Sequence, residues 1–279
     1  MLQKETTDRI LDLVRQKPRT VQEVAAGIQR NWRTADRYVT AIAEETGLIS
    51  MRTFREGSRG ALKVVYWNAL DRAKGTAHQE SLLQRIVHGK RKEDFSPFDI
   101  YQFVDPKKRE AFFETQEFST HPVIRFDKLF SEAKHQVLFF SGNLSWVELG
   151  PNMQKVLLDL AKKKVKIKAL TRVDVTSRKN TEAMLNFNHR AGWDAVEVRH
   201  CEHPLRAIVV DDDFVCLKEV LHPQHYRETE LKQKMFVFYH LCDPEWVQWL
   251  QKVFWHLWGQ SIDATARLKT LDSVQVLRR

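Results

Sequence analysis

The stretch that decides the fold of the N-terminal quarter is 20–45, which reads TVQEVAAGIQRNWRTADRYVTAIAEE. Thr20 and Glu23 stand three residues apart, the spacing of a capping box, in which two side chains satisfy each other's backbone N–H groups at a helix start. Apolar residues then recur at helical spacing twice, around Val24 and around Val39, with a polar turn between the runs. The stretch therefore predicts two amphipathic helices joined by a short turn.

The flanking sequence completes a small domain. Upstream, an apolar stripe that includes Ile10 predicts a first helix ending at Lys17-Pro18, because the residue before proline avoids helical backbone. Downstream, the segments 48–55 and 62–67 alternate as strands around a glycine-containing turn, the pattern of a β-hairpin. Three helices followed by a hairpin predict a winged helix-turn-helix domain over residues 1–75.

This fold places its third helix in the DNA major groove and its hairpin against the backbone or minor groove. The residues expected to contact double-stranded DNA are Arg30, Trp32, Arg33, Arg37 and Thr40 on or beside the third helix, and Arg52, Arg55, Arg59 and Lys63 on the hairpin. Trp32 has two interpretations, a contact with the sugar–phosphate edge or closure of the small core, and core packing is favoured. The alternative for the whole domain is a protein-binding winged helix whose charges are merely solvated.

The distribution of charge favours the DNA interpretation. The 279 residues carry a formal net charge of +9 and a sequence pI of about 9.4. Residues 1–75 hold 14 Lys and Arg against 9 Asp and Glu, whereas residues 135–260 hold 17 against 15. The basic excess therefore lies mainly on the predicted winged helix, where it would meet a polyanion.

Composition excludes several other classes. No apolar run approaches the roughly 20 residues of a membrane-spanning helix, and the polar N-terminus does not resemble a signal peptide. Three cysteines, widely spaced, do not form a disulfide framework. We expect a cytoplasmic protein without a membrane partner.

The C-terminal half has a different pattern. Apolar strands alternate with amphipathic helices over 135–262, which predicts an α/β domain around a mixed sheet and makes the whole chain a multi-domain α/β protein. Residues 76–134 are interpreted as a helical linker or dimer-contact segment, and 263–279 as a C-terminal tail.

The sequence Ser141-Gly142-Asn143 after a strand, together with His203-Pro204-Leu205-Arg206 leading into a strand and Asp211, resembles one half of the phospholipase D fold. A winged helix ahead of such a half is similar to the TrmB-like archaeal transcription regulators. That resemblance implies a C-terminal domain used for ligand sensing. It also implies a homodimer, because one half of the fold normally pairs with a second.

The enzymes of the phospholipase D family use His-x-Lys, four residues and Asp. His203, Arg206 and Asp211 are the weak catalytic candidates, with Arg in place of Lys. His203 stands three residues before Arg206 instead of two, so on an extended chain the two side chains point to opposite faces. The favoured interpretation makes His203 a surface loop residue and Arg206–Asp211 a structural ion pair. The alternative is an anion- or effector-binding pocket of Asn143, Arg206 and Lys218.

Three functions follow from these patterns. The main hypothesis is a DNA-binding transcription regulator whose phospholipase-D-like domain is inactive and serves sensing or dimerisation, with a small-molecule or anionic effector. The runner-up is a phosphodiesterase or nuclease targeted to DNA by the winged helix, and the third is a protein-interaction module. We expect no cofactor. The cluster of His200, Cys201 and His203, with His222 and His225, matches no defensible zinc spacing, so no metal site is predicted.

Overall fold

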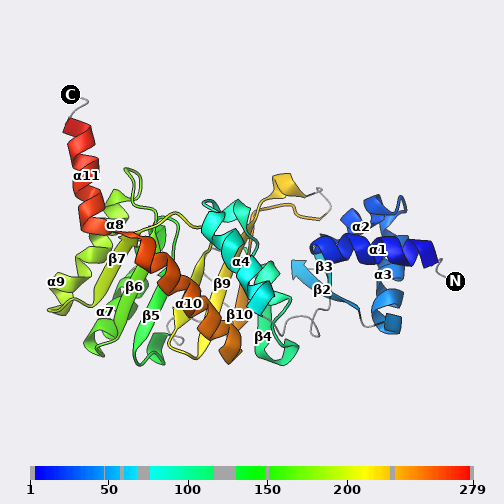
Figure 1. The fold of residues 1–279 in the computed structure, drawn as a ribbon, viewed down its shortest axis with the longest axis horizontal. Coiled ribbons are helices and arrows are strands. Elements are labelled where there is room, and N and C mark those ends of the chain that lie inside the picture. Colours follow the sequence, from blue (N-terminus) through cyan, green and yellow to red (C-terminus); the bar gives the residue numbers. More distant parts are fainter. Residues whose placement is uncertain are drawn as a thin grey trace.

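The computed structural model describes residues 4–46, 48–56, 60–67, 76–115, 130–148, 151–226 and 230–276. An N-terminal module and a larger α/β module lie side by side along the long axis of the molecule (Figure 1). The N-terminal module consists of α1 (Lys4–Gln16), β1 (Arg19–Thr20), α2 (Val21–Gly27), α3 (Trp32–Thr46), β2 (Ile49–Glu56) and β3 (Gly60–Trp67). Its three strands form a small sheet in the order β1-β3-β2.

The elements predicted from the N-terminal sequence are present in the structure. Glu23 donates its backbone N–H to Thr20 Oγ1 at 3.1 Å and its carboxylate accepts from the Thr20 N–H at 2.8 Å, so the capping box is confirmed. Ile10 of α1, Val24 of α2 and Val39 of α3 are fully buried in one core between the helices and the sheet. The winged helix-turn-helix is therefore the observed fold.

The α/β module follows the same alternation that the sequence predicts. Its elements are α4 (Thr76–His88), η1 (Lys92–Asp94), α5 (Phe98–Tyr101), η2 (Pro106–Lys108), β4 (Arg109–Glu114), β5 (Gln136–Phe140), η4 (Ser145–Glu148), α7 (Pro151–Lys162), β6 (Lys166–Thr171), α8 (Arg178–Leu185), α9 (Phe187–Ala191), β7 (Val196–His200), β8 (Ala207–Val210), β9 (Phe214–Leu221), η5 (Pro223–His225), β10 (Met235–Leu241), α10 (Pro244–Gln260), β11 (Ile262–Asp263) and α11 (Ala264–Val276). The predicted multi-domain α/β fold class is confirmed.

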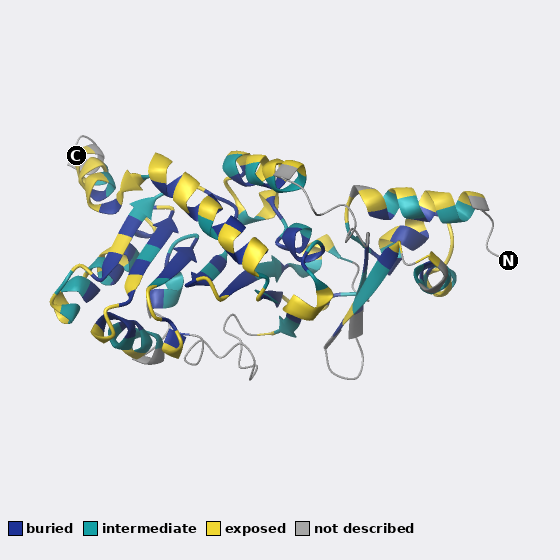
Figure 2. Cartoon of the chain, turned by 60° about the horizontal axis from the view of Figure 1, so that its bottom comes forward, coloured by how far each residue is buried: buried dark blue, intermediate teal, exposed yellow. Residues whose placement is uncertain are grey.

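One mixed sheet of eight strands, in the order β11-β7-β6-β5-β8-β9-β10-β4, organises this module. The pairs β5–β6 and β6–β7 are parallel and the others antiparallel. Successive side chains of a strand face opposite sides, so Leu138 and Phe140 join the core under α10 while Val137 and Phe139 join the core under α7. Figure 2 shows the strands as the buried layer, with the exposed faces of the helices outside it.

The predicted boundaries of the α/β module need correction. The described part of 76–134 is not a linker, because β4 pairs with β10 along its full length and Leu82 and Ile86 of α4 are buried in the same core as α10. The segment after 262 is not merely a tail either. Ile262 pairs with His200, and Ala264 and Leu268 are buried against the sheet.

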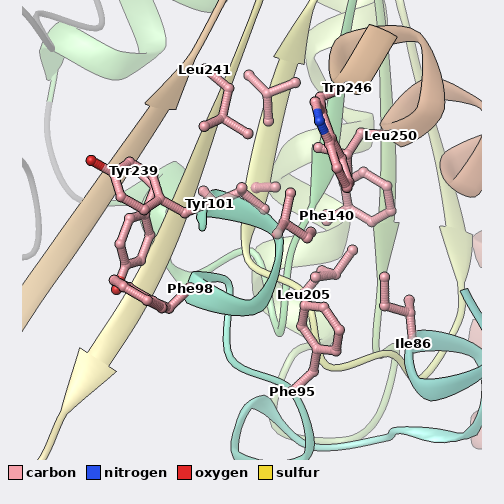
Figure 3. Close-up of a cluster of buried hydrophobic side chains, with 14 of the residues drawn as sticks. Ile86, Phe95, Phe98, Tyr101, Phe140, Leu205, Tyr239, Leu241, Trp246 and Leu250 are labelled. Carbon is pink, nitrogen blue, oxygen red and sulfur yellow. The ribbon is translucent and has the colours of Figure 1, made fainter. Parts of the chain in front are cut away.

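The hairpin β2–β3 belongs to both modules. Ile49 and Val65 face the N-terminal core, whereas Phe54, Leu62 and Tyr66 are buried in the core of the α/β module. Figure 3 shows the centre of that second core, where Phe98, Tyr101 and Tyr239 pack ring against ring; the centroids of the two tyrosines are 5.1 Å apart. One face of the hairpin thus packs into the N-terminal core and the other face into the core of the α/β module.

Candidate nucleic-acid interface and sheet-end cavities

The turn before α3 fixes the direction of the helix. Asn31 caps α3, its side-chain oxygen accepting from the N–H of Thr34 at 2.9 Å. Gln29, two residues earlier, has a φ of +55°, a left-handed conformation that glycine adopts most easily. The turn thus carries a modest backbone strain at Gln29, just before α3 begins.

The outer face of α3 is basic and exposed. Arg30, Arg33 and Arg37 are all exposed, and the Arg33 guanidinium lies 5.8 Å from the centroid of the Trp32 ring. Trp32 itself is 54% exposed, so the favoured prediction that it closes the core is wrong. The buried side of the helix is filled by Ala35, Val39 and Ile42, which leaves the first helical position facing solvent.

Two further predicted contact residues are engaged within the module. Lys63 forms an ion pair with Asp36 at 2.6 Å, both side chains about a third exposed or less. The Thr40 hydroxyl donates to the carbonyl of Asp36 at 2.8 Å, which commits its proton to the helix backbone. The acid that lies between Arg33 and Arg37 on α3 is therefore paired with a lysine of the hairpin.

The prediction that the hairpin arginines contact DNA does not hold for all of them. Arg52 donates to the carbonyl of Ala111 in β4 at 2.8 Å, so its guanidinium joins the two modules instead of lying on a DNA-facing wing. The reason is strand alternation, which gives Arg52 the same face as Phe54. Arg59 lies outside the described residues, as does the side chain of Arg55 at the end of β2.

Sequence reasoning missed a buried arginine at the same junction. Arg109 is 8% exposed, donates to the carbonyl of Tyr101 and reaches the Tyr66 hydroxyl at 3.3 Å. Its guanidinium also lies 4.6 Å from the Tyr101 ring centroid. The only signal in the sequence is an arginine at the start of the alternating segment REAFFE, which reads as easily as a surface residue.

In the α/β module, His203 and Arg206 both lie in the irregular segment before β8, and the Arg206 guanidinium donates to the His203 carbonyl at 3.3 Å. The His203 ring packs edge-on against Phe140, with its Nε2 3.2 Å from the carbonyl oxygen of Leu170. Arg206 lines a cavity together with Phe139, Phe140 and Ile208, which His203 does not line. The expected alternation of faces does not apply to this pair, because β8 begins only at Ala207.

His203 is nevertheless not a surface residue, and that interpretation is wrong. Its side chain is only 3% exposed, and its Nδ1 is buried without a hydrogen-bond partner among the described residues. Burial lowers the pKa of His203 to about 4, and the positive charge of Arg206 lowers it further in the same direction. The ring is therefore neutral near pH 7 and does not line any of the cavities described below.

Asp211 is a structural residue at the far end of β8. Its carboxylate accepts backbone N–H groups from Lys134, His135 and Gln136 at 2.6, 3.0 and 2.7 Å. Arg206 precedes β8 and Asp211 follows it, so their backbones lie roughly 16 Å apart at about 3.3 Å per residue. The predicted Arg206–Asp211 ion pair is therefore wrong, and Asp211 ties the turn after β8 to the start of β5.

Arg206, just before β8, and Lys218, in β9, supply the positive charges of a second candidate site in the α/β module. Lys218 donates its N–H to the Arg206 carbonyl at 2.7 Å, and both side chains line two adjoining cavities, one of about 290 Å³. The Arg206 guanidinium lies over Gly142, where any Cβ would collide with it. Desolvation lowers the pKa of Arg206 to about 10, and within the described residues its guanidinium has no carboxylate ion-pair partner.

Asn143 does not join these two residues. Its side-chain oxygen accepts from the Ser145 N–H at 3.2 Å, and its carbonyl accepts from Asn180. It is absent from the residues that line either Arg206 cavity. The structure thus brings together Arg206 and Lys218, while Asn143 shapes the turn that carries Gly142.

Two absences hold for the part of the chain that the structure describes. No group of three or more His, Cys, Asp or Glu side chains there is arranged to hold a metal ion. No helix in that part has the length and apolar content needed to cross a membrane.

No protein-family model matches the chain, and no curated protein matches it. Solved structures do. The phospholipase D family member Nuc from Salmonella typhimurium is similar over 56% of this chain and 98% of its own, at 18% identity and a TM-score of 0.39. NucT from Helicobacter pylori covers the same shares at 12% identity and a TM-score of 0.37. TrmBL2, described as an archaeal chromatin protein with a novel mode of DNA binding, is similar over 94% of both chains at 13% identity and a TM-score of 0.40. At such values the likeness concerns the arrangement of elements only.

Proposed function

We propose that this protein binds double-stranded DNA through the outer face of α3 and acts as a DNA-binding regulator. The observation that carries the proposal is the convergence of Arg30, Arg33 and Arg37, all exposed, on the end of α3 that a winged helix inserts into the major groove. Asp36, the acid between them, is neutralised by Lys63. Trp32 adds an exposed ring beside Arg33, suited to a sugar–phosphate contact.

The test is a fluorescence-anisotropy titration of a labelled duplex against the full chain at several salt concentrations. Arginine contacts to phosphates release counterions, so the logarithm of the binding constant should fall linearly with the logarithm of salt, with a slope of about −0.9 per phosphate neutralised. Competition with unrelated duplexes then measures sequence preference. A chain that binds no duplex at physiological salt contradicts the proposal.

The regulator role, a homodimer and a cytoplasmic location are parts of the same proposal. A dimer would present two copies of α3 to half-sites about one helical turn, or a multiple of it, apart. Light scattering of the full chain measures its mass directly, and footprinting on genomic DNA reveals whether protected sites are paired. A monomer that leaves single, unpaired footprints contradicts the dimer while leaving DNA binding in place.

We further propose that the α/β module does not hydrolyse phosphodiesters. A histidine nucleophile must reach the substrate, and His203 is buried against Phe140 and Leu170 instead. Incubation with plasmid and with a chromogenic phosphodiester, with and without EDTA, tests this for wild type and for His203→Asn. Turnover that His203→Asn abolishes would restore the phosphodiesterase, the runner-up function.

A second role is favoured by the Arg206–Lys218 pair, which we propose as an anion-binding site. A desolvated guanidinium beside a lysine, without a carboxylate ion-pair partner in the described residues, is stabilised by a bound anion. Calorimetry with inorganic phosphate, comparing wild type with Arg206→Met and with the exposed control Lys252→Met, measures the site. Equal affinity in all three proteins contradicts it.

A further inference from the structure

A cavity of about 330 Å³ lies between the winged helix and the α/β module. The N-terminal module contributes the capping box at Thr20 and Glu23 and the inner face of the hairpin at Phe54 and Leu62. The α/β module contributes residues from α5, β9, η5 and β10, among them Glu219. The cavity therefore exists only while the two modules are in contact, and it is separate from the outer face of α3.

The polar centre of this cavity is the carboxyl group of Glu219. It accepts hydrogen bonds from Ser96 Oγ and from the Tyr239 hydroxyl, both at 2.6 Å. Both partners are neutral, and within the described residues Glu219 takes part in no ion pair. Burial raises the pKa of Glu219, while the hydrogen bonds from Ser96 and Tyr239 act in the opposite direction.

Aromatic rings line the same cavity as the carboxyl group. Phe54, Phe98, Tyr226 and Tyr239 all line the cavity. Ring faces attract cations, and a buried carboxylate within an aromatic box is the usual means of holding an ammonium group. Burial raises the pKa of Tyr226, and the negative charges of Glu219, Glu23 and Glu230 act in the same direction.

Among the described residues that line the cavity, the lysine and the arginine come from the N-terminal module, and His225 of η5 lines it from the α/β module. Lys17 is exposed, and Arg19 forms an ion pair with Glu23 at 3.5 Å, close to the capping box. Neither forms an ion pair with Glu219 in the described part of the structure. Glu219 thus places its carboxyl group on the α/β side of the cavity without a Lys or Arg ion-pair partner among the described residues, which favours a ligand whose positive charge faces that side.

From these contacts we propose that the interdomain cavity is a binding site for a small organic cation, an amine or quaternary ammonium compound, whose charged group sits against Glu219 and the surrounding rings. The apolar part of the ligand contacts Phe54 and Leu62 of the hairpin. The ligand therefore touches both modules at once and stabilises their contact. The site goes beyond the DNA-binding function proposed above and does not rest on it.

Calorimetry of the full chain without DNA tests the site, with choline, phenethylamine and putrescine as probes at pH 8. The matched ligand control is 3,3-dimethylbutanol, which has the shape of choline without its charge. We expect saturable binding of at least one cation, and binding of the neutral analogue weaker by about tenfold or more, since the charge supplies the cation–π and carboxylate attraction.

Variants of residues that line the cavity test whether the cation binds there. Glu219→Gln keeps the hydrogen-bonding shape but removes the charge and should weaken cation binding about tenfold or more, whereas Glu93→Gln, on the neighbouring cavity only, should leave it unchanged. Tyr226→Leu removes one aromatic wall from a partly exposed position and serves if Glu219→Gln does not fold. Equal binding of choline and its neutral analogue, unchanged affinity in both variants, or no saturation by any of the three cations overturns the proposal.

Discussion

Helix α3 and the hairpin β2–β3 are both rich in basic residues, yet the structure uses them in different ways. On α3, Arg33 and Arg37 point into solvent. On the hairpin, Arg52 is bound to the carbonyl of Ala111 and Lys63 to the carboxylate of Asp36. A helix can expose one continuous stripe, whereas a strand sends successive residues to opposite faces, and here both hairpin faces are occupied. A count of basic residues on a predicted wing is therefore a poor measure of its DNA contacts.

The strongest test of this contrast removes the two arginines of α3. Arg33→Ala combined with Arg37→Ala should weaken duplex binding roughly a hundredfold at physiological salt, because each arginine contact contributes about 1–3 kcal/mol, and should reduce the salt slope by about two. Anisotropy titrations measure both. The control pair Lys252→Ala and Lys269→Ala removes the same charge from exposed positions of α10 and α11, and an equal loss there would contradict a localised interface.

Arg52→Met tests the opposite half of the contrast. It should lower the free energy of unfolding by about 2 kcal/mol, since a hydrogen bond from a charged group is lost and the Ala111 carbonyl is left without that donor. Urea denaturation measures the change. DNA affinity of the folded variant should stay within twofold of wild type, and a larger loss of affinity would return Arg52 to the DNA-contacting set.

Asp36→Asn examines the ion pair that links α3 to the hairpin. Removing the carboxylate frees Lys63 and takes one negative charge from the face of α3, so duplex affinity should rise by up to about tenfold at low salt and by less at high salt. Asp8→Asn, an exposed acid on α1, is the matched control. A weaker complex with Asp36→Asn would mean that the pair positions α3 for binding.

The smallest expected effect comes from the turn before α3. Gln29→Gly relieves a left-handed φ that costs a non-glycine residue about 1 kcal/mol, while the greater freedom of glycine in the unfolded chain offsets part of this gain. Thermal unfolding should therefore move upward by no more than a few degrees with DNA affinity unchanged. A clear drop in affinity would show that the side chain of Gln29 itself meets the duplex.

Local signals in the sequence were enough to predict the elements whose stabilising contacts come from residues nearby in the chain. The Thr20–Glu23 capping box and the apolar spacing around Val39 predict α2 and α3 because their partners lie within a few residues. The placement of His203 and Arg206 was not predictable in this way, because both lie in the irregular segment before β8, where strand alternation does not apply.

Contacts between distant segments were not predictable in this way. The segment Arg109–Glu114 becomes an edge strand only because β10 supplies its hydrogen bonds. Trp32 sits on the exposed side of α3 because the small core is already filled by residues of the three helices and of the hairpin. Glu219 reads as an ordinary polar residue of a strand, and only the folded chain places Ser96 and Tyr239 around it.

The shared hairpin means that the winged-helix module cannot be separated from the α/β module without exposing apolar surface. A chain cut after residue 75 would present Phe54, Leu62 and Tyr66 to water, an apolar face that the intact protein covers with its α/β module. The same sharing joins the unfolding of the two modules, because loss of either core exposes a wall of the other. We therefore expect the winged helix and the α/β domain to unfold in one cooperative transition, although each has its own hydrophobic core.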